Sequence, residues 1–166
     1  MASNQKHVFI NIQVSDLARA VKFYEAIGFI QNPFFTSATA SCMVNIEARN
    51  ICVMLLCPDM FGHFLPAGKE AADPTKSTEV LVALSVEKKE DVDQLVEKAV
   101  AAGGTAYPVT TLPESAEGCG PDADSMHNRS FTDPDGHIWE ATWCSEAVLK
   151  AAEEVFKKAL KEKNLE

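Results

Sequence analysis

The stretch Phe9-Ile-Asn-Ile-Gln-Val-Ser-Asp-Leu17 decides the fold, because a strand pattern gives way to a helix pattern within it. From Phe9 to Val14, apolar residues alternate with their neighbours in the period of two that marks a strand with one buried face. From Leu17 onward, apolar residues fall three or four apart, which predicts a helix capped by Asp16 and ended by Gly28. The chain therefore opens with a strand and a helix.

Three short strands are predicted behind this helix, and they complete a βαβββ unit. A polar turn precedes the last of them, and the pattern places the strands at 34–35, 41–46 and 51–57.

The same order then recurs in the second half of the chain. A strand pattern over 79–86 leads into a helix pattern around 92–99, which Gly103 and Gly104 end. Later strands are predicted at 105–109, 127–132 and 138–143, the last two joined by the strong turn sequence Asp133-Pro-Asp-Gly136.

A repeated order predicts an internal duplication whose two modules pair, since one such half cannot bury both faces of its sheet. We expect an α+β fold of paired βαβββ modules, roughly 7–58 and 78–144, in a single domain over 1–146. Residues 147–166 form a separate amphipathic helix, because an apolar stripe runs from Val148 to Leu160 behind the N-cap Ser145. Its apolar face covers either the main domain or a second subunit.

Composition narrows the classes of function. Of 166 residues, 46% are hydrophobic and 23% charged, which indicates a globular chain without a membrane span. The formal net charge of -9 would repel a phosphate backbone, so we expect no nucleic-acid partner. The short polar start lacks an apolar signal region, which predicts a cytoplasmic protein. Five cysteines without a CxxC pair predict free thiols rather than disulfides or structural zinc.

Two long irregular stretches, 58–76 and 112–125, separate the predicted elements. Long loops in a compact domain are often lids or binding loops, and the alternative is a solvated connection.

Three stretches resemble the vicinal oxygen chelate superfamily. Phe9 to Leu17, together with Ala20-Val-Lys-Phe-Tyr24 and Ile27-Gly-Phe29, resembles its opening module, and Ser130 to Glu140 resembles its closing hairpin. The resemblance covers roughly residues 8–143 and implies the glyoxalase/bleomycin resistance/dihydroxybiphenyl dioxygenase-like fold. The superfamily includes glyoxalases, extradiol dioxygenases, fosfomycin-modifying enzymes and bleomycin-binding resistance proteins, so the resemblance informs fold more than reaction.

The catalytic members of this superfamily hold a divalent metal, and the resemblance places its ligand positions at Phe9, Met54, Leu81 and Glu140. Only Glu140 can bind a hard cation, so the usual site is degenerate in this chain. His7 and Glu79 lie two residues from Phe9 and Leu81 on the same strand faces, and they could complete a shifted site for Zn, Ni, Fe or Mn. No cofactor is certain.

Glu140 is the best single candidate for a functional residue, because a carboxylate on a strand is costly to bury unless it is paired or opens into a cavity. It could act as a general acid or base, or only form a structural ion pair. We expect the remaining ligand-binding side chains to share a largely apolar cavity with it, and they are Phe9, Asn11, Met54, Glu79, Leu81, Asn128 and Ser130.

These observations leave three hypotheses. The first is a protein that binds a small apolar or aromatic molecule between its modules. The second is a metal-assisted, glyoxalase-like lyase or isomerase, or a dioxygenase-like enzyme, that uses Glu140 as base or ligand. The third is an interaction module whose C-terminal helix is exchanged within a homodimer.

Overall fold

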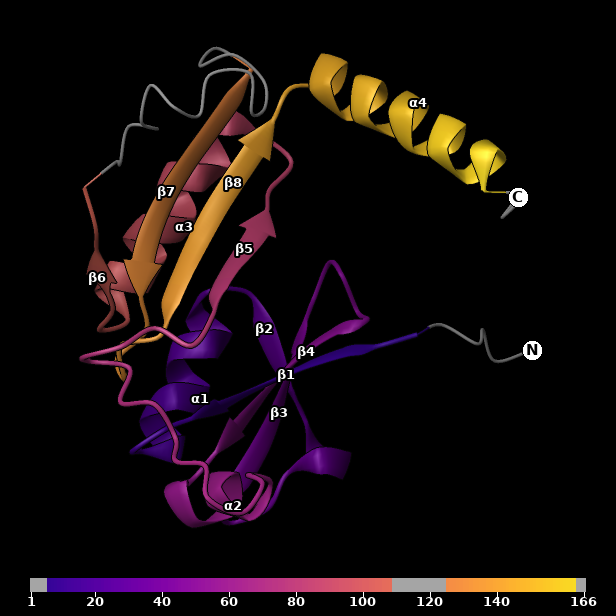
Figure 1. The fold of residues 1–166 in the computed structure, drawn as a ribbon. Helices are drawn as coiled ribbons and strands as arrows, with labels where there is room; N and C mark the ends of the chain where they lie inside the picture. Colours follow the sequence, from indigo (N-terminus) through magenta and orange to yellow (C-terminus); the bar gives the residue numbers. More distant parts are fainter. Residues whose placement is uncertain (1–5, 109–124, 164–166) are drawn as a thin grey trace.

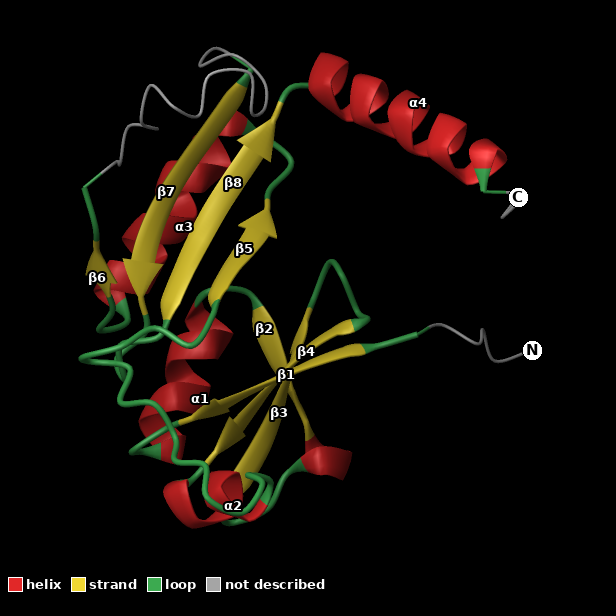
Figure 2. Ribbon diagram, viewed as in Figure 1, coloured by secondary structure: helices red, strands yellow, loops and turns green. Residues whose placement is uncertain are grey.

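The computed structural model describes residues 6–108 and 125–163, which form two four-stranded sheets, each backed by one long helix (Figures 1 and 2). The order of elements is the same in both halves of the chain, and the predicted α+β fold of paired βαβββ modules is confirmed. A further helix follows the second module.

The first module contains β1 (Val8–Gln13), α1 (Leu17–Ala26), β2 (Phe29–Asn32), β3 (Ala40–Asn45) and β4 (Ile51–Leu56). Its sheet has the order β1-β4-β3-β2, in which β1 and β4 are parallel and the other pairs antiparallel. The Asp16 side chain caps α1, and Gly28 has a φ of 96°, a left-handed conformation that favours glycine.

The predicted strand at 34–35 is wrong. These residues belong to a short 3₁₀ helix, η1 (Pro33–Phe35), and the strand lies just before it, at β2. Pro33 has no backbone N–H and a fixed φ, so it ends the ladder and starts the turn, which Asn32 caps by accepting the Phe34 N–H.

The second module contains β5 (Leu81–Ser85), α3 (Lys89–Ala101), β6 (Thr105–Ala106), β7 (Met126–Thr132) and β8 (Ile138–Cys144). Its sheet has the order β5-β8-β7-β6 and repeats the parallel first pair of the other sheet. The connection between the modules is not wholly irregular, because Pro58 starts the short helix α2 (Pro58–His63). The predicted loop at 112–125 falls almost entirely outside the described residues.

The modules meet through their helix-covered sides and share one core. Tyr24 of α1 packs edge-on against Trp139 of β8, with ring centroids 5.6 Å apart, and Phe23 lies 6.4 Å from Phe131 of β7. All four rings are fully or almost fully buried. Local periodicity predicts a buried face in each module, and the structure shows that the two buried faces are continuous.

A buried polar cluster joins the same elements. The Tyr24 hydroxyl donates to Asp133 Oδ2 at 2.9 Å and accepts from Trp139 Nε1 at 3.1 Å. Asp133 Oδ1 accepts the backbone N–H groups of the turn residues Asp135, Gly136 and His137. Burial raises the pKa of Tyr24 well above its usual value, and the nearby Asp133 charge raises it further. The turn between β7 and β8 is therefore anchored to α1.

The last helix, α4 (Glu146–Glu162), confirms the predicted C-terminal helix and is capped by Ser145, whose side chain accepts the Val148 N–H. Figure 1 shows α4 projecting from the end of β8, away from both modules.

Candidate functional site

Glu140 lies in the middle of β8, on the face of the second sheet that α3 does not cover. Its Oε1 accepts a 2.6 Å hydrogen bond from Asn128 Nδ2 of the neighbouring strand, and its Oε2 accepts a longer one, 3.4 Å, from the Thr142 hydroxyl. Ser130 is its direct cross-strand partner. The carboxylate is half-buried and accepts hydrogen bonds from two neutral donors.

Glu140 opens into a cavity of about 620 Å³ on this outer face of the second sheet. The exposed side chain of Leu81, 69% accessible, lies at its β5 edge, and Tyr107 and Pro108 follow β6 at the other side. The lining is mostly apolar, and it consists of Leu81, Ala83, Tyr107, Pro108, Ser130, Ile138 and Glu140.

The predicted site residues fall into two groups. Leu81 and Ser130 line the cavity with Glu140, and Asn128 touches Glu140 directly. Phe9, Asn11 and Met54 lie on the outer face of the first sheet, where register places Asn11 beside Met54, and they do not line this cavity. The cavity around Glu140 therefore belongs to the second module, whereas the sequence analysis expected a hollow shared by both.

Glu79 takes a different place from the predicted one. Its carboxylate contacts His137 Nδ1 at 2.8 Å, while His137 Nε2 lies 2.7 Å from the carbonyl oxygen of Gln13 at the end of β1. Each ring nitrogen of His137 therefore faces an oxygen atom of a different element, one before β5 and one at the end of β1. Glu79 thus helps to join the modules through His137, a turn residue that the sequence analysis did not select.

The residues proposed for a metal do not gather. Among residues 6–108 and 125–163, no three His, Cys, Asp or Glu side chains lie close enough to hold a metal ion. His7 stands beside Phe9 on the first sheet, and Glu79 faces His137 rather than Glu140. The set His7, Glu79 and Glu140 does not fit a divalent metal site in this arrangement.

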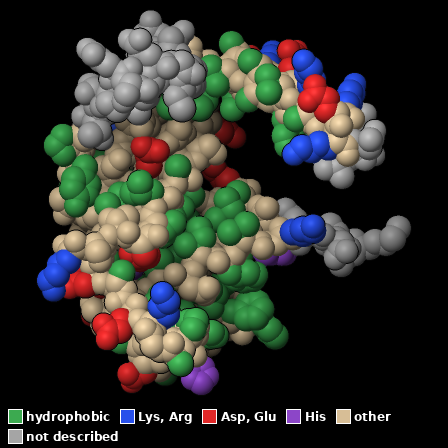
Figure 3. All heavy atoms as spheres, viewed as in Figure 1, with side chains coloured by type: hydrophobic (Ala, Val, Ile, Leu, Met, Phe, Trp, Pro, Cys, Tyr) green, Lys and Arg blue, Asp and Glu red, His purple; other side chains and the backbone are tan. Residues whose placement is uncertain are grey.

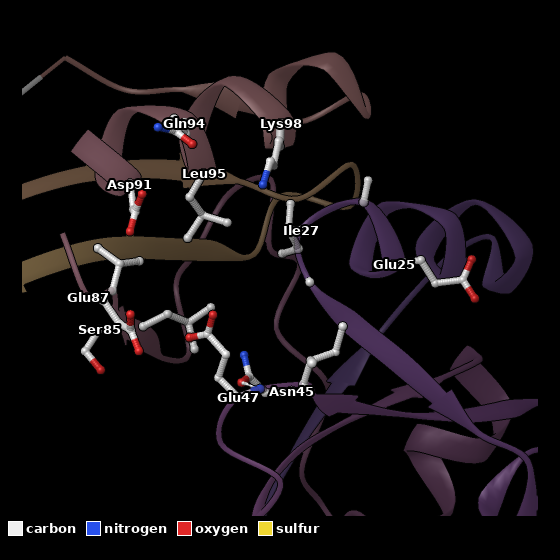
Figure 4. Close-up of a pocket in the computed structure, with 15 residues that line it drawn as sticks. Glu25, Ile27, Asn45, Glu47, Ser85, Glu87, Asp91, Gln94, Leu95 and Lys98 are labelled. Carbon is white, nitrogen blue, oxygen red and sulfur yellow. Dashed lines mark hydrogen bonds between the residues drawn. The ribbon is translucent and has the colours of Figure 1, made fainter. Parts of the chain in front are cut away.

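Another cavity, of about 390 Å³, lies where the modules join (Figure 4). Leu95 and Lys98 of α3 line one side of it, and Asn45 and Glu47 at the end of β3 line the other. Within the described residues, the acidic side chains of this cavity are not close enough to one another to form a metal site. None of the site residues predicted from the sequence lines this cavity.

Tyr107 and Pro108 are cavity residues that the sequence analysis missed. The Tyr107 backbone N–H donates to the Ser130 carbonyl at 2.9 Å, which places Tyr107 next to a residue already selected. The sequence could have indicated both residues, because they lie in the strand predicted at 105–109, and this strand pairs with the strand that contains Ser130.

The fold places this chain in the class of proteins that are built from two paired βαβββ modules. The model of the Glyoxalase/Bleomycin resistance protein/Dioxygenase superfamily matches residues 5–141, and the chain belongs to this superfamily. None of the curated proteins matches the chain. No helix in the described ranges has the length and apolar character needed to cross a membrane.

Solved structures support the same fold. A hypothetical protein from S. aureus is 26% identical, with a TM-score of 0.61 over 87% of this chain and 95% of that one. A glyoxalase/bleomycin resistance protein/dioxygenase family enzyme from Burkholderia phytofirmans is 18% identical, with a TM-score of 0.66 over 84% and 99%. The fosfomycin resistance protein FosX from Listeria monocytogenes is 18% identical, with a TM-score of 0.51 over 87% and 94%. The last two show similarity of fold alone.

The outer face of the first sheet contains two buried thiols, Cys42 of β3 and Cys52 of β4. Burial, and then the neighbouring Cys52, raise the pKa of Cys42 from 9.0 to about 11. The native state therefore favours the neutral thiol of Cys42. The stability that the neutral thiol contributes is fully present below pH 9.0 and is lost as the pH rises through about 11.

We expect Cys42 to resist alkylation in the folded protein at pH 8. The raised pKa leaves about a hundredfold less thiolate than in an ordinary cysteine, and burial blocks access. Iodoacetamide labelling followed by peptide mass spectrometry should modify the partly exposed Cys57 first, and Cys42 only after denaturation. Equal labelling rates for the two cysteines in native protein would contradict this.

Proposed function

We propose that this protein binds a small, largely apolar or aromatic molecule in the cavity over the second sheet, with Glu140 as its polar anchor. The observation that supports this most is the combination of a mostly apolar lining with one half-buried carboxylate. Binding sites commonly have this form, in which apolar surface supplies affinity and a few polar groups fix orientation.

The charge of the cavity restricts the ligand. Its lining contains no Lys, Arg or His side chain, so nothing in the described lining would clamp a phosphate, phosphonate or carboxylate. Glu140 instead favours a ligand with a hydrogen-bond donor, and most of all an amine or another cation. We infer an aromatic or aliphatic compound that bears one such donor.

A second candidate is proton-transfer catalysis of the lyase or isomerase type, with Glu140 as general base. The observation that favours it is the 2.6 Å hydrogen bond from Asn128, which holds the carboxylate at the cavity in a fixed orientation. In this reading Glu140 removes a proton from a carbon next to a carbonyl of the bound compound. The residues that line the cavity provide the base but no group dedicated to a metal.

Thermal unfolding in the presence of a library of aromatic amines and their neutral analogues tests both candidates. A ligand at about 100 times its Kd stabilises by about 2.7 kcal/mol, which raises the Tm by about 5–10 °C in a chain of this size. We expect Glu140→Gln to bind the best amine about 10–100-fold more weakly, because a charge-assisted hydrogen bond is lost. The affinity for the neutral analogue should change little.

Glu154→Gln provides the matched control, since Glu154 is an exposed glutamate of α4 and does not line the cavity. This variant should bind like the unmodified protein. Equal affinity of Glu140→Gln and the unmodified protein for every stabilising amine would refute the anchor role, and a library without any stabilising compound would refute the ligand class. NMR spectra of the bound ligand over time separate the candidates, because conversion supports the enzyme and an unchanged ligand supports the binding protein.

A further inference from the structure

Three sulfur-bearing side chains, called the sulfur cluster below, lie together on the outer face of the first sheet. Cys42 is fully buried, Cys52 is 4% exposed, and their thiols are hydrogen-bond partners. Met54 lies directly opposite Cys42 on the neighbouring strand and two residues after Cys52 on its own strand, so all three side chains share one face. Their sequence neighbours Met43 and Val53 belong to the core on the helix-covered side, which leaves the sulfur cluster on the other side of the sheet.

The two thiols are not placed for an ordinary disulfide. The direct cross-strand partner of Cys52 is Val44, so Cys42 and Cys52 are diagonal neighbours on the β3–β4 ladder. The Cα atoms of diagonal pairs lie roughly 7–8 Å apart, whereas those of disulfides usually lie about 4.4–6.8 Å apart. A metal ion bonded to both sulfur atoms, at about 2.3 Å from each as in zinc thiolates, spans a wider gap than an S–S bond. The arrangement therefore suits an ion between the sulfur atoms better than a bond that joins them.

The ligand atoms of the sulfur cluster select a soft metal ion. Thiolates and thioethers bind Cu(I), zinc and iron–sulfur clusters rather than hard cations. Within residues 6–108 and 125–163, no third His, Cys, Asp or Glu side chain joins the two cysteines. Structural zinc almost always takes four nitrogen, oxygen or sulfur ligands from such residues, and iron–sulfur clusters usually take four cysteines. Of the metals that sulfur ligands select, Cu(I) therefore fits this set.

The surroundings of the sulfur cluster are apolar and open at one side. Phe9 of β1 is the cross-strand neighbour of Cys52 and is 49% exposed. Figure 3 shows hydrophobic side chains gathered on the side of the molecule between α4 and the N-terminal strand, where the surface is hollowed. An apolar shell disfavours a strongly hydrated cation more than a soft ion bound to sulfur. Met54 is only half-buried, so it gives an ion a route from solvent to the thiols.

We propose that Cys42, Cys52 and Met54 form a binding site for one Cu(I) ion. Both thiols release their protons to solvent when the ion binds, because a thiol that coordinates a metal is deprotonated. One positive ion thus replaces two protons, and no electron is transferred, since copper enters and stays as Cu(I). The flexible side chain of Met54 lets its thioether act as the third ligand.

Anaerobic titration of the full chain with Cu(I), in competition with the coloured chelator bathocuproine disulfonate, tests the site. We expect one ion per chain. Cys42→Ser and Cys52→Ser should each weaken binding by more than about 100-fold, because loss of a group behind a metal ligand already costs about 10–100-fold. Met54→Leu preserves the side-chain volume and should weaken binding by about 10-fold, because a thioether is the weaker ligand.

The remaining cysteines of the chain provide the matched control. The triple variant Cys57→Ser/Cys119→Ser/Cys144→Ser keeps only Cys42 and Cys52, and it should bind one ion as tightly as the unmodified protein. The proposal would be overturned if the double variant Cys42→Ser/Cys52→Ser bound one ion as tightly as the unmodified protein. It would equally be overturned if the triple variant, with intact circular dichroism, bound none.

X-ray absorption spectroscopy of the copper-loaded, unmodified protein supplies a measurement that does not depend on the folding of any variant. We expect only sulfur atoms as the nearest neighbours of copper, because the three proposed ligands are two thiolates and one thioether. Nitrogen or oxygen atoms among these neighbours would show that copper binds elsewhere, and would refute the proposed site.

Discussion

Replacement of Asp133 by alanine is expected to lower the free energy of unfolding by about 3–5 kcal/mol. The carboxylate is 3% exposed and accepts four hydrogen bonds, three from backbone N–H groups of its own turn and one from the Tyr24 hydroxyl. Alanine leaves all four donors without this acceptor in a buried place. Since small domains are stable by only about 5–15 kcal/mol, the change is large.

Asp133→Asn is the matched control for this prediction. Its side-chain oxygen can still accept the three N–H groups, and only the bond from Tyr24 lacks an acceptor. Burial raises the pKa of Asp133, which means that the charged form is penalised in the native state, and the neutral amide avoids this penalty. We therefore expect a loss of about 1–2 kcal/mol for asparagine. Urea unfolding of both variants measures the difference, and equal losses would show that the hydrogen bonds are not the cause.

Gly104→Ala is expected to destabilise the protein by about 2–4 kcal/mol. Gly104 connects α3 to β6, and a Cβ there would overlap the carbonyl oxygen of Thr132. The same Cβ would lie 3.0 Å from both the Ala99 carbonyl oxygen and the Phe23 ring. Two of these three neighbours are backbone atoms in regular elements, so the added methyl group must displace α3 or β7. Thermal or urea unfolding measures the loss.

Gly62→Ala provides the comparison, because a Cβ at Gly62 meets no heavy atom within 4 Å. Gly62 lies in α2, where alanine is favoured over glycine by about 0.5–1 kcal/mol. We expect this variant to be as stable as the unmodified protein or slightly more so. If Gly104→Ala were equally well tolerated, close packing between α3 and the end of β7 could not be what requires glycine there.

Both large effects concern the junction of the modules rather than the candidate site. Asp133 holds the turn between β7 and β8 against α1, and Gly104 lets α3 approach the same turn and Phe23. Glu140 lies on β8, just beyond this turn, so the junction fixes the strand on which the candidate site is built. The continuous buried core therefore lies on the helix-covered sides of the two sheets.

The sequence by itself determined most of the local structure. Alternation around Ile12 and Leu84 predicted strands with one buried face, and both side chains are buried on the side of the helices. The helix signals Asp16, Gly28 and Ser145 act as expected at their termini. The turn Asp133 to Gly136 fixed the register of the last hairpin, and so placed Ser130 opposite Glu140. These features depend on neighbours close in sequence, which periodicity and turn chemistry report directly.

Tertiary structure alone decided how the halves meet. Periodicity shows that a face is buried but not what covers it, so a shared hollow between the outer sheet faces was as consistent with the sequence as the observed core around Tyr24 and Trp139. The contact between Glu79 and His137 spans 58 residues, and no local pattern encodes it. Phe9 and Met54 therefore do not line the cavity at Glu140, although the alternation of the sequence placed all three side chains on the outer faces of their strands.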